Sequence, residues 1–213
     1  MKIHRFVATT FAAGLLVAAS DASAQSFYVG AYGGVNYAHE SDVTVDGIGG
    51  YTIDSDIGYA VGGFVGYDFG NSFRLEGELT YRRNSLDSFS LGPLSTPMEG
   101  DASALALMVN GLYDFDSGSD ITPHIGAGAG IARFSVIDAR PVGIPDPPTS
   151  EDDTVFAYQF IVGVGYDLSP TSSFFVDYRL FATVDPGFTN TSGEVIELSY
   201  LSSALLFGIS TSF

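Results

Sequence analysis

The chain has 213 residues, with 8 Lys or Arg against 25 Asp or Glu, a formal net charge of −17 and no cysteine. So acidic a surface would repel phosphates, which argues against a nucleic-acid partner. The absence of cysteine excludes a disulfide framework and a thiolate metal site. The 26 Gly, 12 Tyr and 17 Phe, with no Trp, favour a curved β-sheet over helices.

The first residues have the pattern of a secretory signal peptide. Lys2 and Arg5 form a short positive head, an apolar run follows over residues 6–19, and Ala22-Ser23-Ala24 supplies small residues for cleavage. The apolar run is shorter than the roughly 18–20 residues that a membrane-spanning helix needs. We therefore predict a cleaved signal peptide over residues 1–24 and one mature domain over residues 25–213, with 6 basic and 24 acidic residues.

After the signal, apolar residues recur at every second position, which is the period of a β-strand. The alternation predicts eight strands, in chain order at about residues 27–37, 58–69, 73–82, 104–115, 121–134, 155–168, 174–181 and 198–213. The third is the clearest, because apolar and polar residues alternate strictly along it: Phe73, Leu75, Leu79 and Tyr81 on one face, and Arg74, Glu76, Glu78, Thr80 and Arg82 on the other.

The connections between these strands are alternately short and long. The short ones span residues 70–72, 116–120 and 169–172, and the long ones span residues 40–56, 84–102, 135–154 and 182–197. The long ones contain 16 of the 24 acidic residues of the mature chain. This layout predicts an all-β fold, an eight-stranded antiparallel up-and-down transmembrane β-barrel. We expect the short turns and both termini on the periplasmic side and the four long loops on the extracellular side.

The two faces of the strands favour a membrane barrel over a soluble one, which would be apolar inside and polar outside. The less apolar face is rich in glycine, which suits the close walls of a narrow lumen: Gly30, Gly34, Gly58, Gly62, Gly66, Gly126, Gly128, Gly130, Gly163 and Gly165. The chain also ends in Phe213, with Ile209 and Phe207 on the same face. This ending resembles the carboxy-terminal signal for insertion into the outer membrane. We therefore expect contact with outer-membrane lipid and lipopolysaccharide, and with the barrel-assembly machinery during insertion.

A weak repeat precedes the three short turns, as Tyr67-Asp68-Phe69, Tyr113-Asp114-Phe115 and Tyr166-Asp167-Leu168. In the barrel the tyrosines are expected in the aromatic girdle at the inner lipid interface. The aspartates are then expected at the mouth of the lumen.

Several segments together resemble the outer-membrane β-barrel (porin-like) domain family, which includes opacity-type surface proteins and the barrel of outer-membrane protein A. They are Phe27-Tyr28-Val29-Gly30-Ala31, residues 74–84, residues 122–128, Ala157-Tyr158-Gln159 and Asp177-Tyr178-Arg179. The resemblance covers the whole mature chain through the order and spacing of these segments. It implies an outer-membrane barrel, here without the periplasmic peptidoglycan-binding domain of the larger members.

Six ionisable residues are predicted to form a polar network in the lumen: Arg74, Glu76, Glu78, Arg82, Asp177 and Arg179. Arg74 is expected near the periplasmic turn and Arg82 near the outer rim. An unpaired buried charge is costly, so these groups should pair across the lumen. The network is interpreted as a structural plug, because eight strands leave room only for side chains. The alternative is the gate of a small passive channel for ions or small solutes.

Catalysis would require an activated Ser beside a base, as in the small outer-membrane barrels that transfer or remove acyl chains. The mature chain has only two histidines, His39 and His124, and neither lies in an enzyme motif. We predict no catalytic residue, cofactor or metal. The predicted function is a non-enzymatic barrel whose acidic loops contact host or neighbouring cells or lipopolysaccharide, as a surface antigen, adhesin or envelope-integrity protein.

Overall fold

The computed structural model describes residues 26–39, 41–45, 49–55, 57–91, 94–141, 149–184, 187–189, 195–198 and 200–213. The predicted signal peptide lies outside these residues. Within the described ranges, no helix is long and apolar enough to cross a membrane.

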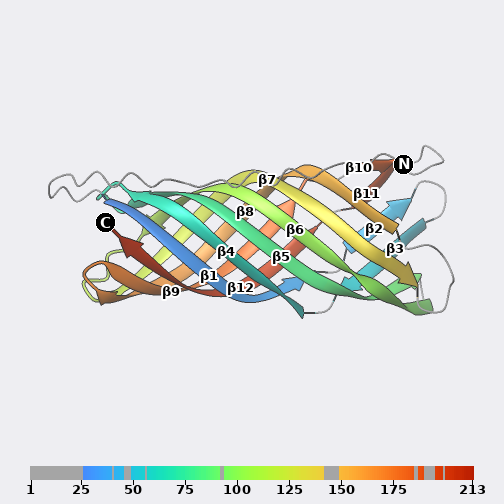
Figure 1. Cartoon of the computed structure of the whole chain (residues 1–213), viewed down its shortest axis with the longest axis horizontal. Coiled ribbons are helices and arrows are strands. Elements are labelled where there is room, and N and C mark those ends of the chain that lie inside the picture. The colour runs from blue at the N-terminus through green and yellow to red at the C-terminus, as the bar shows by residue number, and fades with distance from the viewer. Residues whose placement is uncertain are drawn as a thin grey trace, which may run out of the picture.

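Eight long strands close into a barrel (Figure 1). They are β1 (Ser26–Ala38), β4 (Ile57–Asp68), β5 (Phe73–Leu91), β6 (Leu94–Asp114), β7 (Ile121–Pro141), β8 (Thr149–Ser169), β9 (Ser172–Thr183) and β12 (Leu201–Ser212). Neighbouring strands pair antiparallel; β1 pairs with both β4 and β12, and the pairing of β5 with β6 closes the ring. The predicted eight-stranded antiparallel barrel is thus confirmed.

The three predicted short turns lie at one end of the barrel, together with the start of β1 and the end of β12. The turn between β4 and β5 is held by Asp68, whose Oδ1 accepts a hydrogen bond of 2.7 Å from the backbone N–H of Gly70. Gly70 and Ser72 both have a φ of 70° there, which places them in the left-handed region. This end is the periplasmic end of the barrel.

Four short strands continue the sheet beyond the other end, on the right in Figure 1. They are β2 (Ser41–Val45), β3 (Gly49–Ser55), β10 (Gly187–Thr189) and β11 (Val195–Leu198). β3 pairs with the far part of β5, from Thr52 against Ser90 to Ser55 against Leu86, and the order β10-β11-β2-β3 extends the sheet outward from there.

The strands at this extracellular end are longer than the sequence predicts. β5 and β6 pair as far as Leu91 against Leu94, within the predicted loop 84–102, and β7 and β8 extend into the predicted loop 135–154. The sequence does not show this, because the extensions lack the regular alternation of apolar and polar residues that predicts a strand. β-bulges interrupt the pairing in these extensions, between Ser85 and Ser88 and between Val136 and Ala139.

The burial of the side chains divides each strand into an outer and an inner face. On β5, Leu75 and Leu79 are about half exposed, at 47% and 52%, whereas Glu76 and Glu78 between them are 2% and 1% exposed. The same alternation on β8 leaves Phe160 and Val162 exposed and buries Ile161. An exposed apolar belt around a barrel with buried charges is the arrangement that a lipid environment stabilises. The predicted faces of the strands are therefore confirmed.

Aromatic rings inside the lumen lie over glycines of the neighbouring strand. Tyr28 is paired with Gly66, Phe64 with Gly30, Tyr32 with Gly62 and Phe175 with Gly208. In each pair, a Cβ atom built on the glycine would overlap the ring opposite it. The bare backbone gives each large ring the space to lie flat against the barrel wall. The lumen is therefore filled by these rings as well as by polar groups.

Candidate functional site in the barrel lumen

At mid-depth the lumen is crossed by an ion pair between strands on opposite walls. Nη1 of Arg179 on β9 is bonded to Oε2 of Glu78 on β5, and both side chains are almost fully buried. Arg179 also binds Asp177 on its own strand through Nη2, at 2.8 Å. The guanidinium lies 4.5 Å from the centre of the Tyr32 ring, which adds a cation–π contact.

Neutral side chains complete the environment of Glu78. Its carboxylate accepts hydrogen bonds from the hydroxyl of Thr80 at 2.5 Å and from the amide of Asn110 at 2.8 Å. The amide of Gln159 donates to Oδ1 of Asn110 at 2.8 Å. Six buried residues from β5, β6, β8 and β9 are joined in this way: Glu78, Thr80, Asn110, Gln159, Asp177 and Arg179. We call them the mid-lumen layer.

A second cluster lies nearer the periplasmic end, around Arg74. Its guanidinium forms a bidentate pair with Asp114, with both hydrogen bonds at 2.7 Å. Nη1 of the same guanidinium lies 3.4 Å from Oε1 of Glu76, and the hydroxyl of Tyr28 donates to this oxygen at 2.8 Å. Arg74 therefore links β5 to β6, and Tyr28 links both to β1.

His124 joins this region to the mid-lumen layer. Its Nε2 lies 2.9 Å from Oδ1 of Asp177, and both residues are buried. Asp177 thus accepts from His124 through one oxygen and from Arg179 through the other.

Arg82 lies over an aromatic ring of the lumen and is linked to Glu78 through Gln159. That it lies near the outer rim stays a prediction; its side chain has no exposed surface, and its guanidinium lies 4.1 Å from the centre of the Phe181 ring. Its Nη2 lies 3.4 Å from Oε1 of Gln159, and its Nε and Nη1 have no hydrogen-bond partner in the described part of the chain.

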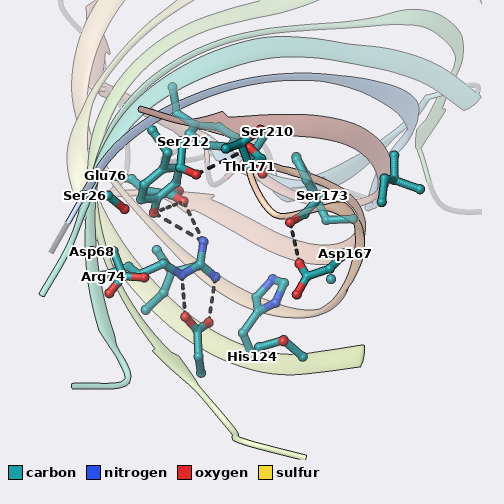
Figure 2. Close-up of a pocket in the computed structure, with 18 of the residues that line it drawn as sticks. Ser26, Asp68, Arg74, Glu76, His124, Asp167, Thr171, Ser173, Ser210 and Ser212 are labelled. Carbon is teal, nitrogen blue, oxygen red and sulfur yellow. Dashed lines mark hydrogen bonds and ion pairs between the residues drawn. The ribbon is translucent and has the colours of Figure 1, made fainter. Parts of the chain in front are cut away.

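The periplasmic end of the lumen opens into a cavity of about 710 Å³, which we call the periplasmic vestibule (Figure 2). It ends inward at Glu76, Asp177 and Arg179. Six carboxylates line it: Asp68, Glu76, Asp114, Asp120, Asp167 and Asp177. Three of these, Asp68, Asp114 and Asp167, are the aspartates of the sequence repeat, which lie at the lumen mouth as predicted.

A Ser–His contact lies on the outer face, at the extracellular end. Nε2 of His39 lies 2.7 Å from Oγ of Ser203, which also accepts a hydrogen bond of 2.9 Å from the hydroxyl of Tyr178. The sequence shows both histidines but not this pairing, because Ser203 is 164 residues away from His39.

A model of the outer membrane protein β-barrel domain family matches residues 9–201 of the chain. The chain belongs to this outer-membrane β-barrel family. Membership confirms the predicted family and the predicted location in the outer membrane of Gram-negative bacteria. A search of the curated protein sequences finds no match.

Solved structures of other outer-membrane barrels resemble this family member in fold. Neisserial surface protein A aligns at 22% identity and a TM-score of 0.55, over 91% of this chain and all of that one. OprG from Pseudomonas aeruginosa aligns at 14% identity and a TM-score of 0.55, over 88% and 96%. The outer membrane protease OmpT from Escherichia coli aligns at 9% identity and a TM-score of 0.52, over 88% and 97%. At these identities the likeness is one of fold.

In this family member, several residues of the lumen are not in the set predicted from the sequence. Tyr28, Tyr32, Asn110, His124 and Gln159 all contact the predicted ionisable groups. The alternation places Tyr28 and Tyr32 on the inner face, which is the one available signal. The carboxylate partner of Arg74, Asp114, is also outside the predicted set. The pairing of β5 with β6 brings these two residues together.

Proposed function

We propose that this outer-membrane barrel is a non-enzymatic anchor that presents an acidic extracellular surface, in a surface-antigen, adhesion or envelope-integrity role. The observation that carries this proposal is the mid-lumen layer. Its residues are buried and bonded to one another across the lumen, as expected of a plug in a barrel too narrow for an open pore. A protein with a plugged lumen acts through its two ends.

The extracellular end supports such a role. The segments that continue the sheet there lie within the four stretches that hold 16 of the 24 mature acidic residues. Paired strands hold these segments out from the membrane, and surface segments on a rigid scaffold are where recognition is usually found.

Planar-bilayer conductance of the refolded protein tests the plug. We expect no steady channel in the native protein, and channels in a variant with Arg179→Ala and Glu78→Ala, which removes both large side chains of the ion pair. Steady, ion-selective channels in the native protein would instead establish the passive channel.

Shortening one hairpin at a time tests the surface role. Replacing residues 88–97, or residues 139–149, by a short Gly-Ser turn leaves the barrel part of each strand in place. We expect reduced adhesion of the cells to host surfaces or reduced serum survival for at least one hairpin. Unchanged adhesion and survival for both variants, with normal surface amounts, would contradict the proposal.

The proposal that the barrel is not an enzyme can be tested at the contact of Ser203 with His39. A nucleophilic serine beside a base on the lipid face is the arrangement that an acyl-chain hydrolase would need. We expect mass spectrometry to find the same lipid A acyl chains in cells that overexpress the native protein and in cells with Ser203→Ala. Loss of acyl chains with the native protein alone would establish a hydrolase.

A further inference from the structure

The arginines of the barrel are divided between the lumen and the extracellular end. Beyond residue 24 the chain has six arginines and no lysine. Three of the arginines belong to the lumen contacts described above. The other three are on the parts of β5 and β7 nearest the extracellular end: Arg83, Arg133 and Arg140. Arginines outside the lumen are therefore found toward one end of the barrel only.

Arg83 and Arg133 lie on the outer face, at the extracellular boundary of the apolar belt. Both side chains are exposed. On β5 the outward residues from Phe73 to Tyr81 are hydrophobic or glycine, and Arg83 is the next outward residue. On β7 the outward residues from Ile121 to Ile131 are all apolar, and Arg133 is the next. An outward charge just beyond such a belt lies at the level of the lipid headgroups.

β6 separates the two arginines and fixes the distance between them (Figure 1). Arg83 is paired with Ser103 of β6, and Arg133 with Leu105. Two strand spacings and an offset of two residues place the Cα atoms of the two arginines about 12 Å apart. Because arginine side chains are long and flexible, both guanidinium groups can reach a single headgroup.

An apolar row crosses the three strands on the membrane side of the arginines. Leu79 on β5 is paired with Leu107 on β6, and Leu107 is paired with Ile131 on β7. All three side chains are about half exposed on the outer face. A lipid with its headgroup at the two arginines would lay its acyl chains over this row.

The charges of the extracellular end favour an anionic headgroup at this place. The long segments there hold 16 of the 24 acidic residues of the mature chain, and they repel phosphates. Guanidinium groups bind phosphate oxygens through two parallel N–H groups. Arg83 uses Nη2 to bind Asp101 at 2.7 Å, which engages one of the five N–H groups of its guanidinium. The lipid at this level of a Gram-negative outer membrane is lipopolysaccharide, whose sugar headgroup carries phosphates.

We propose that Arg83 and Arg133 bind the phosphorylated headgroup of one lipopolysaccharide molecule on the outer wall of β5, β6 and β7, with its acyl chains over the apolar row. Asp101 competes with the phosphate for Arg83. The site is on the lipid-facing wall and does not depend on the extracellular role proposed above.

Native mass spectrometry of the refolded protein in detergent micelles tests the proposal. The titrant is lipopolysaccharide without its O-chain, and EDTA is present so that no divalent cation bridges phosphates to carboxylates. We expect one tightly bound molecule per barrel. The variant with Arg83→Gln and Arg133→Gln should bind about tenfold or more weakly, which corresponds to about 1.4 kcal/mol. It should refold, because both side chains are exposed.

Two further variants are the controls. Arg140→Gln removes the same charge from β7 as Arg133→Gln, seven residues further along the strand, and should leave the affinity unchanged within about twofold. Asp101→Asn breaks the same ion pair as Arg83→Gln, but it leaves the guanidinium to the phosphate. Its affinity should therefore equal or exceed that of the native protein.

Each of the following results would overturn the site. Unchanged affinity in the double variant would mean that the arginines take no part, and an equal loss in Arg140→Gln would mean a general attraction of charges. A loss in Asp101→Asn as large as in Arg83→Gln would mean that the ion pair only shapes the wall. Equal binding of dephosphorylated lipopolysaccharide would mean that acyl chains suffice, and equal binding of phosphatidylglycerol that any anionic lipid does.

Discussion

Arg179 on β9 and Glu78 on β5 form a buried ion pair across the lumen, although they are 101 residues apart in the sequence. The sheet order places β5 and β9 on opposite walls, so the pair ties together two strands that share no backbone hydrogen bonds. A contact of this kind can form only once the barrel has closed.

Replacing Arg179 should therefore strongly destabilise the barrel. Arg179→Gln leaves Glu78 and Asp177 buried without their cation, and removing one partner of a buried pair costs about 3–5 kcal/mol. Urea unfolding in lipid vesicles measures this change in the free energy of unfolding. Adding Glu78→Gln to the same variant should recover part of the loss, since the uncompensated charge is then gone.

The exposed pair of Arg83 with Asp101 serves as the control for this measurement. It is joined at 2.7 Å but lies at the extracellular edge, where water screens it. Arg83→Gln should leave the free energy of unfolding almost unchanged. Equal effects of Arg83→Gln and Arg179→Gln would show that the mid-lumen pair contributes no more than a surface pair.

The aromatic rings over glycine predict an unequal response of two glycines on β1. A Cβ atom at Gly30 would overlap the ring of Phe64, whereas at Gly33 it would make an ordinary contact, 3.5 Å from Cγ1 of Val61. Gly30→Ala should destabilise the barrel by about 1–3 kcal/mol through overpacking. Gly33→Ala, on the outer face of the same strand, should be neutral. Similar unfolding curves for the two variants would contradict the close packing of Phe64.

The terminal residue Phe213 is predicted to act in membrane insertion rather than in stability. It is 49% exposed, and its N–H donates to the carbonyl of Phe27 at 3.0 Å, a bond that any residue could make. In cells, Phe213→Ala should lower the fraction of folded barrel in the outer membrane severalfold. Refolded in vitro, the same variant should be about as stable as the native protein.

Phe27→Ala is the matched control for Phe213→Ala. Phe27 is an exposed aromatic residue at the same end of the barrel but not at the end of the chain. A loss of assembly as large as that of Phe213→Ala would mean that the aromatic girdle, and not a terminal signal made with Ile209 and Phe207, sets the insertion yield.

The carboxyl of Asp101 should titrate at unusually low pH. The hydrogen bond from Arg83 is the main cause that lowers the pKa of this carboxyl below its ordinary value. The folded-state pKa is thus below the unfolded one. The stabilising contribution is complete above about pH 3.9, the ordinary value, and is lost as the pH falls through the lower folded-state value. Carboxyl NMR titration should show a lower midpoint in the native protein than in Arg83→Gln.

Much of the barrel could be predicted from the alternation of residues, because lipid and lumen impose opposite demands on successive side chains. The residues of β5 from Phe73 to Arg82 show this best, since each lies on the predicted face. The far parts of β5 to β8 could not be predicted, because the regular alternation of apolar and polar residues stops there. The contacts of Arg82 could not be predicted either. The alternation along a strand shows that a residue points into the lumen, but it does not show its depth or its neighbours there.

The sequence by itself determined the number of strands in the barrel, the lipid-facing side, the short turns and the acidic balance of the chain. These depend on local pattern and composition, and the transfer of side chains between water and lipid enforces them. The tertiary structure decided which inward groups meet: Arg179 with Glu78, Arg74 with Asp114, and each ring with its glycine. The physical reason is the stagger of the closed sheet. It fixes which residues of distant strands share one level of the lumen, and no single strand carries that information.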